Sequence, residues 1–225
     1  MELKVMIEIR DLVYRNLHIP ELTIHSGTTA LIGKNGSGKT TLLRLLAGLS
    51  QPESGLITLK EKPLIAGATG FVNEYPDKNA LFSRVYDELA GPLRFRYYSC
   101  DDIRDRVLEV AGQAGLDQYL NRTMDTLSGG EKVLIALLSA VICGPEILIL
   151  DEFDSHLDYD TQEEADKLIA SSGSSLIVRC TQNMDLAARC GAIIVLQGGS
   201  VLHTGPPEKV FAALETTCCY PFTWR

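Results

Sequence analysis

The segment from Gly33 to Thr40 carries the residue types and spacing that bind a chain of phosphates. It reads Gly-Lys-Asn-Gly-Ser-Gly-Lys-Thr, which fits the pattern G-x-x-x-x-G-K-[ST]. The glycines let successive backbone N–H groups turn toward one anion, and the helix that follows adds the positive end of its dipole. We expect Lys39 to reach the β- and γ-phosphates of a nucleotide and the Thr40 hydroxyl to bind Mg²⁺. The predicted phosphate-binding residues are Gly33, Lys34, Asn35, Gly36, Ser37, Gly38, Lys39, Thr40 and Thr41.

A second candidate site begins where an apolar strand, 147–150, ends in Asp151 and Glu152. Asp151 could hold Mg²⁺ through water, and Glu152 could orient a water molecule that attacks the terminal phosphate. Mg²⁺ prefers one or two carboxylates together with phosphate oxygens, which suits this pair. On its own the pair would also fit a turn with solvated carboxylates. The phosphate-binding pattern in the same chain favours the metal and water roles.

A third segment, Leu127 to Glu131, reads Leu-Ser-Gly-Gly-Glu and precedes an apolar helical pattern. Ser128 is placed to cap that helix, with Glu131 completing a capping box. The serine hydroxyl and the open N–H groups of Gly129 and Gly130 also form a second possible anion site at a helix N-terminus. The two interpretations are compatible, so we include Ser128, Gly129, Gly130 and Glu131 among the predicted nucleotide-binding residues.

Strand and helix patterns indicate how these segments are positioned. Continuous apolar strands separated by helices are typical of an α/β fold with a buried parallel sheet. In the middle of the chain the period changes to that of helices, and Asp101 or Asp102 is placed to cap one of them. The expected strands lie within 2–32 and at 56–59, 64–65, 70–72, 147–150, 176–178 and 193–196, and the expected helices lie at 39–49, within 80–142, at 161–170 and at 184–189.

Composition limits the class of protein. The 225 residues carry a net charge of −8, and 45% are hydrophobic against 22% charged, which excludes a disordered or fibrous chain. The acidic balance argues against general nucleic-acid binding. No stretch approaches the ~20 apolar residues of a membrane span, and the N-terminus lacks a signal peptide, so we expect a cytoplasmic protein. Reduced thiols follow, and Cys100, Cys143, Cys180, Cys190, Cys218 and Cys219 show no C-x-x-C zinc spacing.

Together these segments make the chain resemble an ATP-binding-cassette (ABC) ATPase over nearly its whole length. The resemblance includes residues 154–158, which match the D-loop of that family. It implies a P-loop NTPase fold with a RecA-like, mostly parallel sheet, an N-terminal antiparallel β subdomain and a helical signature subdomain at roughly 80–143. Residues 1–225 would then form a single nucleotide-binding domain.

The resemblance also implies partners. In this family two cassettes dimerise head to tail, so that the phosphate loop of one and the signature serine of the other enclose each ATP. We therefore expect a second cassette, as a homodimer or heterodimer, and a separate transmembrane coupling subunit. Residues 75–77, 81–82, 88–93 and 205–211 are similar to segments of energy-coupling-factor (cobalt-type) importer ATPases. That likeness implies an importer subunit on the inner face of the cell membrane.

Three positions depart from the family pattern. Glu74 falls where the family has the Q-loop glutamine; a carboxylate there could still bind Mg²⁺ but adds negative charge beside the nucleotide. Gln182 replaces the switch histidine, and it cannot carry the positive charge that would stabilise the γ-phosphate. Asn16 stands where an aromatic residue would stack on adenine, with Tyr14 as the nearest substitute or as a residue that packs the sheet. His156 falls in the D-loop, which meets the partner.

We therefore expect an ATP hydrolase that requires Mg²⁺, with Glu152 and Gln182 as catalytic residues and Thr40, Asp151 and Glu74 as metal ligands. The two substituted positions predict slow turnover. One alternative is a soluble member of the superfamily with a regulatory or DNA-linked role, although the chain lacks the long inserts or second cassette that would favour it. A P-loop kinase is a further alternative, but it would not need the signature and D-loop.

Overall fold

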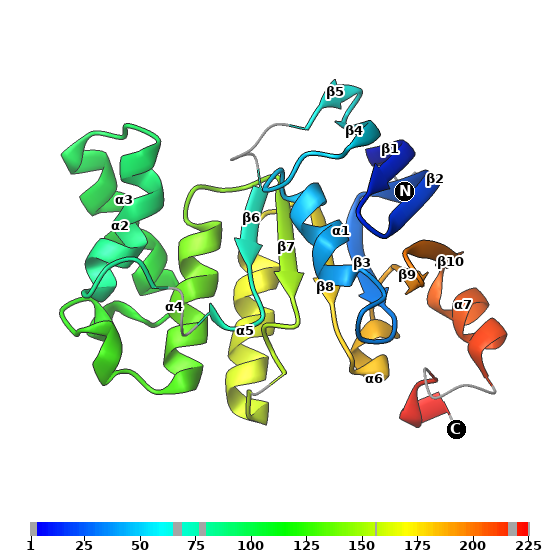
Figure 1. Ribbon diagram of the computed structural model, residues 1–225. Coiled ribbons are helices and arrows are strands. Elements are labelled where there is room, and N and C mark those ends of the chain that lie inside the picture. Colours follow the sequence, from blue (N-terminus) through cyan, green and yellow to red (C-terminus); the bar gives the residue numbers. More distant parts are fainter. Residues whose placement is uncertain (1–3, 65–68, 77–79, 156, 216–219, 225) are drawn as a thin grey trace. The chain divides into compact units, whose positions relative to one another are not determined.

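The computed structural model (Figure 1) describes residues 4–64, 69–76, 80–155, 157–215 and 220–224. The chain divides into two compact units: residues 1–71, 146–152 and 175–225 form the first, and residues 72–145 and 153–174 form the second. Among the residues discussed above, Ile65, Asp77, His156, Cys218 and Cys219 lie outside the described part of the chain.

The first unit is built on a six-stranded sheet in the order β10-β9-β3-β8-β7-β6. The neighbours of β3 are parallel to it, as is β7 to β8, whereas β10 is antiparallel to β9. The strands are β3 (Gly27–Ile32), β6 (Thr69–Val72), β7 (Ile147–Asp151), β8 (Leu176–Cys180), β9 (Ala192–Gln197) and β10 (Ser200–Gly205).

Both faces of this sheet are covered, which explains why its central strands are almost entirely apolar. In β3, Leu31 belongs to a cluster with helix α1 (Lys39–Leu46). Ala30 and Ile32 belong to a second cluster with helices α6 (Met184–Ala187) and α7 (Pro207–Leu214). Alternate side chains of one strand therefore enter two different cores.

A separate antiparallel sheet, in the order β2-β1-β4-β5, packs into the α1 cluster. Its strands are β1 (Val5–Tyr14), β2 (Leu17–His25), β4 (Ser54–Leu59) and β5 (Lys62–Pro63). The last of these lies just before the 64–65 segment in which a strand was predicted. A C-terminal 3₁₀ turn, η4 (Phe222–Trp224), completes the first unit.

The second unit is helical. Helix α2 packs against α3 and α4, and α4 packs against α5. Its elements are α2 (Val85–Phe95), α3 (Cys100–Gln113), the 3₁₀ turns η2 (Asp117–Tyr119) and η3 (Met124–Thr126), α4 (Gly129–Val141) and α5 (Tyr159–Ser171). Among the described residues of the whole chain, no helix is long and apolar enough to cross a lipid bilayer.

Some predicted helix ends were wrong. The cap of α3 is Ser99, not Asp101 or Asp102: the Ser99 Oγ accepts from the Asp102 N–H at 3.2 Å and donates to the Asp102 carboxylate at 2.6 Å. Helix α1 ends at Leu46, before the predicted Leu49, because Gly48 adopts φ +70° and turns the chain out of the helix.

Candidate functional site

The phosphate loop joins the end of β3 to the start of α1. Gly38 caps α1 with φ +102°, a conformation that costs glycine nothing, and the Ser37 N–H closes a turn onto the Lys34 carbonyl at 3.1 Å. Lys34, Asn35, Gly36 and Thr40 are exposed, whereas Ser37 and Lys39 are buried. The loop therefore presents its backbone to solvent while Lys39 reaches inward beneath it.

The β9–β10 hairpin supports the loop from behind. The Gly199 N–H donates to the Ser37 carbonyl at 3.1 Å. Gly33 has φ +153°, and a Cβ atom there would lie 2.3 Å from the Leu196 carbonyl oxygen. Only glycine fits so close an approach, so the hairpin fixes where the loop leaves β3.

The buried hydroxyl of Ser37 has no hydrogen-bond partner within the described residues. Buried polar groups are nearly always paired, and an orphan calls for a ligand or an explanation. A hydroxyl held inside a loop of this type is placed to bond an anion. This observation fits a nucleotide phosphate in the loop.

Glu152 is the centre of the site. It follows the last residue of β7 with φ +45°, a conformation that is uncommon for a residue other than glycine and that often marks a functional position. Its carboxylate lies 3.3 Å from the Lys39 ammonium and accepts a 2.6 Å hydrogen bond from the Gln182 side-chain amide. The Cys180 thiol donates to the same carboxylate at 3.5 Å.

Strand register explains why these side chains meet. Cys180 lies opposite both Leu31 of β3 and Asp151 of β7, so these three parallel strands end at one edge of the sheet. The residues just beyond that edge, Glu152 and Gln182 among them, must converge there. Gln182 also lies 3.5 Å from the Asn35 side-chain oxygen, which joins the loop to this cluster.

Lys39 makes three polar contacts within the described part of the chain. Its ammonium donates to the carbonyls of Gly33 at 3.0 Å and Lys34 at 3.4 Å and pairs with Glu152. The two charged side chains are only 6% and 13% exposed, so each depends on the other for compensation. A phosphate in the loop would supply Lys39 with a replacement anion.

Cys180 was not predicted from the sequence as a residue of this site. Its burial raises the pKa of the thiol far above the ordinary value, and the negative charges of Asp151 and Glu152 raise it further. The protonated form can donate to Glu152, whereas a thiolate could not. No local pattern indicates this contact, because it depends on β8 being the neighbour of β7.

Thr40 and Asp151, two of the predicted metal ligands, both carry oxygen donors. Asp151 is buried at the end of β7, and the Thr40 hydroxyl is exposed in the first turn of α1. Across the described residues, no group of three or more His, Cys, Asp or Glu side chains forms a metal cage. A few oxygen donors beside a phosphate loop suit Mg²⁺, which retains water and phosphate oxygens as ligands.

Two further residues named from the sequence are Glu74 and Tyr14. Glu74 belongs to the second unit and is exposed beside Tyr75, whose N–H donates to the Asn73 side chain at 3.1 Å. Tyr14 packs against the α1 core and carries the Arg15 guanidinium 5.3 Å from its ring centre. These contacts agree with a sheet-packing role for Tyr14.

The signature segment lies in the second unit and forms the predicted capping box. The Ser128 Oγ accepts from the Glu131 N–H at 3.2 Å, and the Glu131 carboxylate accepts from the Ser128 N–H at 2.7 Å. That second bond holds the pKa of Glu131 below its ordinary value. Ser128 and Gly129 are both exposed, so the capping box leaves this helix N-terminus accessible to an anion.

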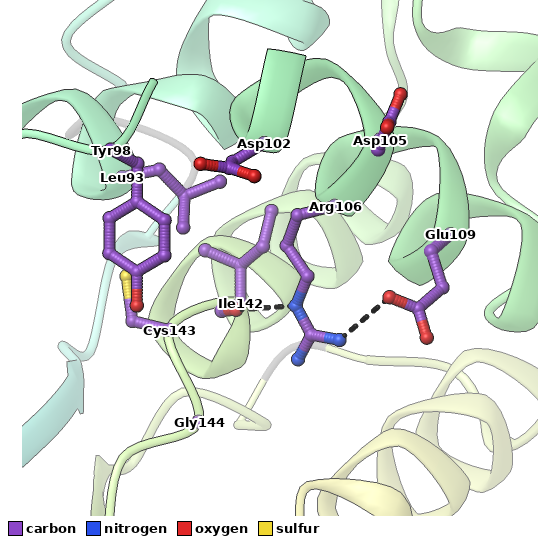
Figure 2. Close-up of a pocket in the computed structure, with 9 residues that line it drawn as sticks. All are labelled: Leu93, Tyr98, Asp102, Asp105, Arg106, Glu109, Ile142, Cys143 and Gly144. Carbon is purple, nitrogen blue, oxygen red and sulfur yellow. Dashed lines mark hydrogen bonds and ion pairs between the residues drawn. The ribbon is translucent and has the colours of Figure 1, made fainter. Parts of the chain in front are cut away.

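A hollow of about 630 Å³ lies between α2, α3 and the end of α4 (Figure 2). Across it Arg106 donates to the Ile142 carbonyl at 3.1 Å and pairs with Glu109 at 3.0 Å. Arg106 thus caps the C-terminus of α4. The lining contains none of the predicted phosphate, metal or signature residues, so this hollow is not the nucleotide site.

Comparisons with known proteins agree with this geometry. The ABC transporter family model matches residues 17–155. The nickel import ATP-binding protein NikO of Rhodobacter capsulatus is 36% identical over 213 residues, covering 85% of this chain and 84% of that protein. The energy-coupling factor transporter ATP-binding protein EcfA1 of Bacillus subtilis is 31% identical over 225 residues, covering 92% and 80%.

Solved structures agree in fold. CbiO1 of Clostridium perfringens, part of the ABC transporter complex CbiONQ, has a TM-score of 0.82 and 26% identity, covering 95% of this chain and 93% of that one. A dimeric ATP-binding cassette bound to ADP and Pi has a TM-score of 0.75 at 22% identity, covering 90% and 99%. The predicted P-loop fold is thereby confirmed. The chain belongs to the ABC transporter family and is one of its ATP-binding, ATP-hydrolysing cassettes.

Proposed function

We propose that this cassette powers an importer of the energy-coupling-factor type from the inner face of the cell membrane. The names of its relatives, nickel import and energy-coupling factor transporter ATP-binding proteins, support this assignment. So does the segment from Glu88 to Leu93, which the sequence relates to the same group. The transmembrane coupling subunit would be a separate chain.

Within the cassette, the phosphate loop binds the nucleotide. The open backbone N–H groups, the Ser37 hydroxyl and the Lys39 ammonium surround the phosphates, and α1 adds the positive end of its dipole. Once a phosphate neutralises Lys39, the carboxylate of Glu152 loses that partner and is released toward an attacking water. Gln182 remains as its neutral hydrogen-bond donor. The convergence of Lys39, Glu152 and Gln182 is the observation that carries the proposal.

Thr40 and Asp151 would hold Mg²⁺, with Glu74 as the third candidate. The ion, when bound, neutralises charge on the phosphates and orients them for attack. The chain contributes the hydroxyl and the buried carboxylate, and the phosphates and water supply the other oxygens.

Ser128, Gly129 and Gly130 would close over the ATP held by the phosphate loop of a second cassette. A helix N-terminus with an exposed serine hydroxyl is suited to the terminal phosphate. Each nucleotide site would then need two chains, which links nucleotide binding to closure of the dimer.

Substitution Lys39→Ala tests the site. It removes the side-chain cation, so we expect ATP binding to weaken at least about tenfold and hydrolysis to fall to background. Lys62→Ala, which removes an exposed lysine of β5, is the charge-matched control. Binding of a fluorescent ATP analogue and phosphate release are the measurements. A Lys39→Ala protein that hydrolyses ATP at the wild-type rate would show that the nucleotide site is elsewhere.

A further inference from the structure

The C-terminal turn η4 lies beside α6, the short helix that follows Gln182 (Figure 1). The backbone N–H and the hydroxyl of Thr223 both donate to one carboxylate oxygen of Asp185, at 3.0 and 2.6 Å. These hydrogen bonds hold the pKa of Asp185 below its ordinary value, which is the signature of an engaged carboxylate. The turn is therefore hydrogen-bonded to the second residue of α6.

The other side of η4 is anchored on α7. The Trp224 ring meets that of Phe211 edge-on at 5.4 Å between centres, and Tyr220 completes the trio at 6.4 Å from Trp224. Phe211 is fully buried. Because aromatic pairs of this geometry add to the energy of burial, α7 gives the turn a second anchor beside Asp185.

Helix α6 leads directly into the catalytic cluster. Asn183 caps it, and the Asn183 side chain accepts from the backbone of Asp185 at 3.0 Å. The Asn183 N–H donates to the Thr181 hydroxyl at 3.0 Å, which shapes the turn that carries Gln182. Gln182 then donates to Glu152. A continuous series of hydrogen bonds and neighbouring residues therefore connects Thr223, through Asp185 and the turn at Gln182, to the Glu152 carboxylate.

We propose that Thr223 and Asp185 are positioning residues for ATP hydrolysis, which hold the turn at Gln182 where its side chain reaches Glu152. Helix α6 has only four residues, too few to be stable alone, so tertiary contacts must set its position. Those contacts come from β3 on one side and η4 on the other. The inference rests on the proposed roles of Gln182 and Glu152, and the experiment separates its failure from theirs.

The test compares Thr223→Val, which removes the hydroxyl donor, with Thr223→Ser, which keeps it. We expect Thr223→Val to lower kcat about three- to tenfold with KM for ATP unchanged within twofold, and Thr223→Ser to retain the wild-type kcat. Ser171→Ala is the matched control, because it removes another exposed hydroxyl that bonds a backbone carbonyl, that of Leu168. Its kcat should not change. The assay uses the full chain in the assembly that turns over ATP.

A double-mutant cycle tests whether Thr223 acts on kcat through Gln182. In a Gln182→Ala background, Thr223→Val should cause no further loss of kcat, since the hydroxyl acts through Gln182. Trp224 is the single tryptophan, so acrylamide quenching of its fluorescence reports whether η4 has left its place. Asp185→Ala should increase quenching and lower kcat together.

Several results would overturn the inference: an unchanged kcat in Thr223→Val, an equal loss in the Gln182→Ala background, or increased Trp224 quenching in Asp185→Ala with an unchanged kcat. If Gln182→Ala itself had no effect while Lys39→Ala abolished hydrolysis, the inference would also fail, but the nucleotide site would stand. If Lys39→Ala were fully active, the proposed site would fail first.

Discussion

At the scale of single residues, Glu152 explains most of the site. Its left-handed backbone turns the carboxylate back over the sheet edge, where it meets one cation and two neutral donors. The cation, Lys39, is also the expected partner of the phosphates. A nucleotide phosphate bound to Lys39 would therefore replace the ion pair of that lysine with Glu152.

The neutral donor from Gln182 predicts a slow enzyme. A histidine at this position could carry a charge toward the γ-phosphate, and loss of one such contact typically costs about 2–4 kcal/mol in the transition state, or about one to three decades in rate. We expect Gln182→His to raise the steady-state kcat, and Glu74→Gln to add to it by removing a negative charge. If the single and double variants were no faster than wild type, the neutral arrangement around Glu152 would be sufficient as it is.

The individual site residues could be predicted to different degrees. Lys39 and Glu152 follow from local patterns, because a glycine-rich turn and an apolar strand each have a recognisable end. The contact from Cys180 to Glu152 depends on which strands are neighbours, and no local pattern encodes that. The fastening of Thr223 to Asp185 was likewise not foreseen, since it joins residues 38 positions apart.

At the scale of elements, the phosphate loop depends on the hairpin behind it. Gly33→Ala would place a Cβ atom against the Leu196 carbonyl as well as straining the backbone. We expect it to lower the free energy of unfolding by about 2 kcal/mol or more and to abolish ATP binding.

Gly27→Ala is the matched control for that variant. Gly27 has φ +106° but open space around it, so alanine there brings backbone strain without a clash, at about 1–2 kcal/mol. ATP binding should survive. Urea unfolding and nucleotide titration of both variants measure the difference, and equal losses in the two would mean that the hairpin does not shape the loop.

The capping box of α4 gives a pH-dependent prediction. Because Glu131 has a folded-state pKa below its ordinary 4.5, its charge stabilises the folded chain above that pH and the contribution is lost as the pH falls. Glu131→Gln keeps an acceptor but removes the charge, so wild type should be more stable by about 0.5 kcal/mol at neutral pH. Urea unfolding should show that this difference in the free energy of unfolding becomes smaller as the pH falls. A difference that is independent of pH would contradict the prediction.

Element boundaries show where sequence patterns stop being informative. The capping box at Ser128 was predictable because serine and glutamate stand at the required spacing before an apolar run. At α3, Ser99, Asp101 and Asp102 are three possible acceptors within four residues, and the prediction considered only the two aspartates. The structure selects Ser99 and lets Asp102 bond back to it. The last strand of the small sheet, β5, lies before the predicted 64–65 segment for a similar reason, since it has only two residues and no periodicity.

At the scale of the whole molecule, the two units divide the chemistry. The first carries the phosphate loop and Glu152, and the second carries the signature. A dimer in which each nucleotide contacts both kinds of surface makes ATP the link between chains. A ligand that binds the dimer and not the monomer stabilises the dimer by mass action. The fraction of dimer should therefore rise with the concentration of ATP.

Glu152→Gln tests this dependence on ATP. The amide no longer accepts the proton of an attacking water, yet the phosphate loop and signature remain intact, so ATP should bind without being hydrolysed. The substitution also converts the ion pair with Lys39 into a neutral contact, which leaves the lysine freer for phosphate. We expect Glu152→Gln to elute as a dimer on gel filtration in saturating ATP and Mg²⁺ and as a monomer without them, with Lys39→Ala monomeric in both. Since a heterodimer would also leave the isolated chain monomeric, a candidate second cassette is added in a parallel run. A Glu152→Gln chain that stays monomeric with ATP and with that cassette would show that nucleotide does not join two copies of this fold.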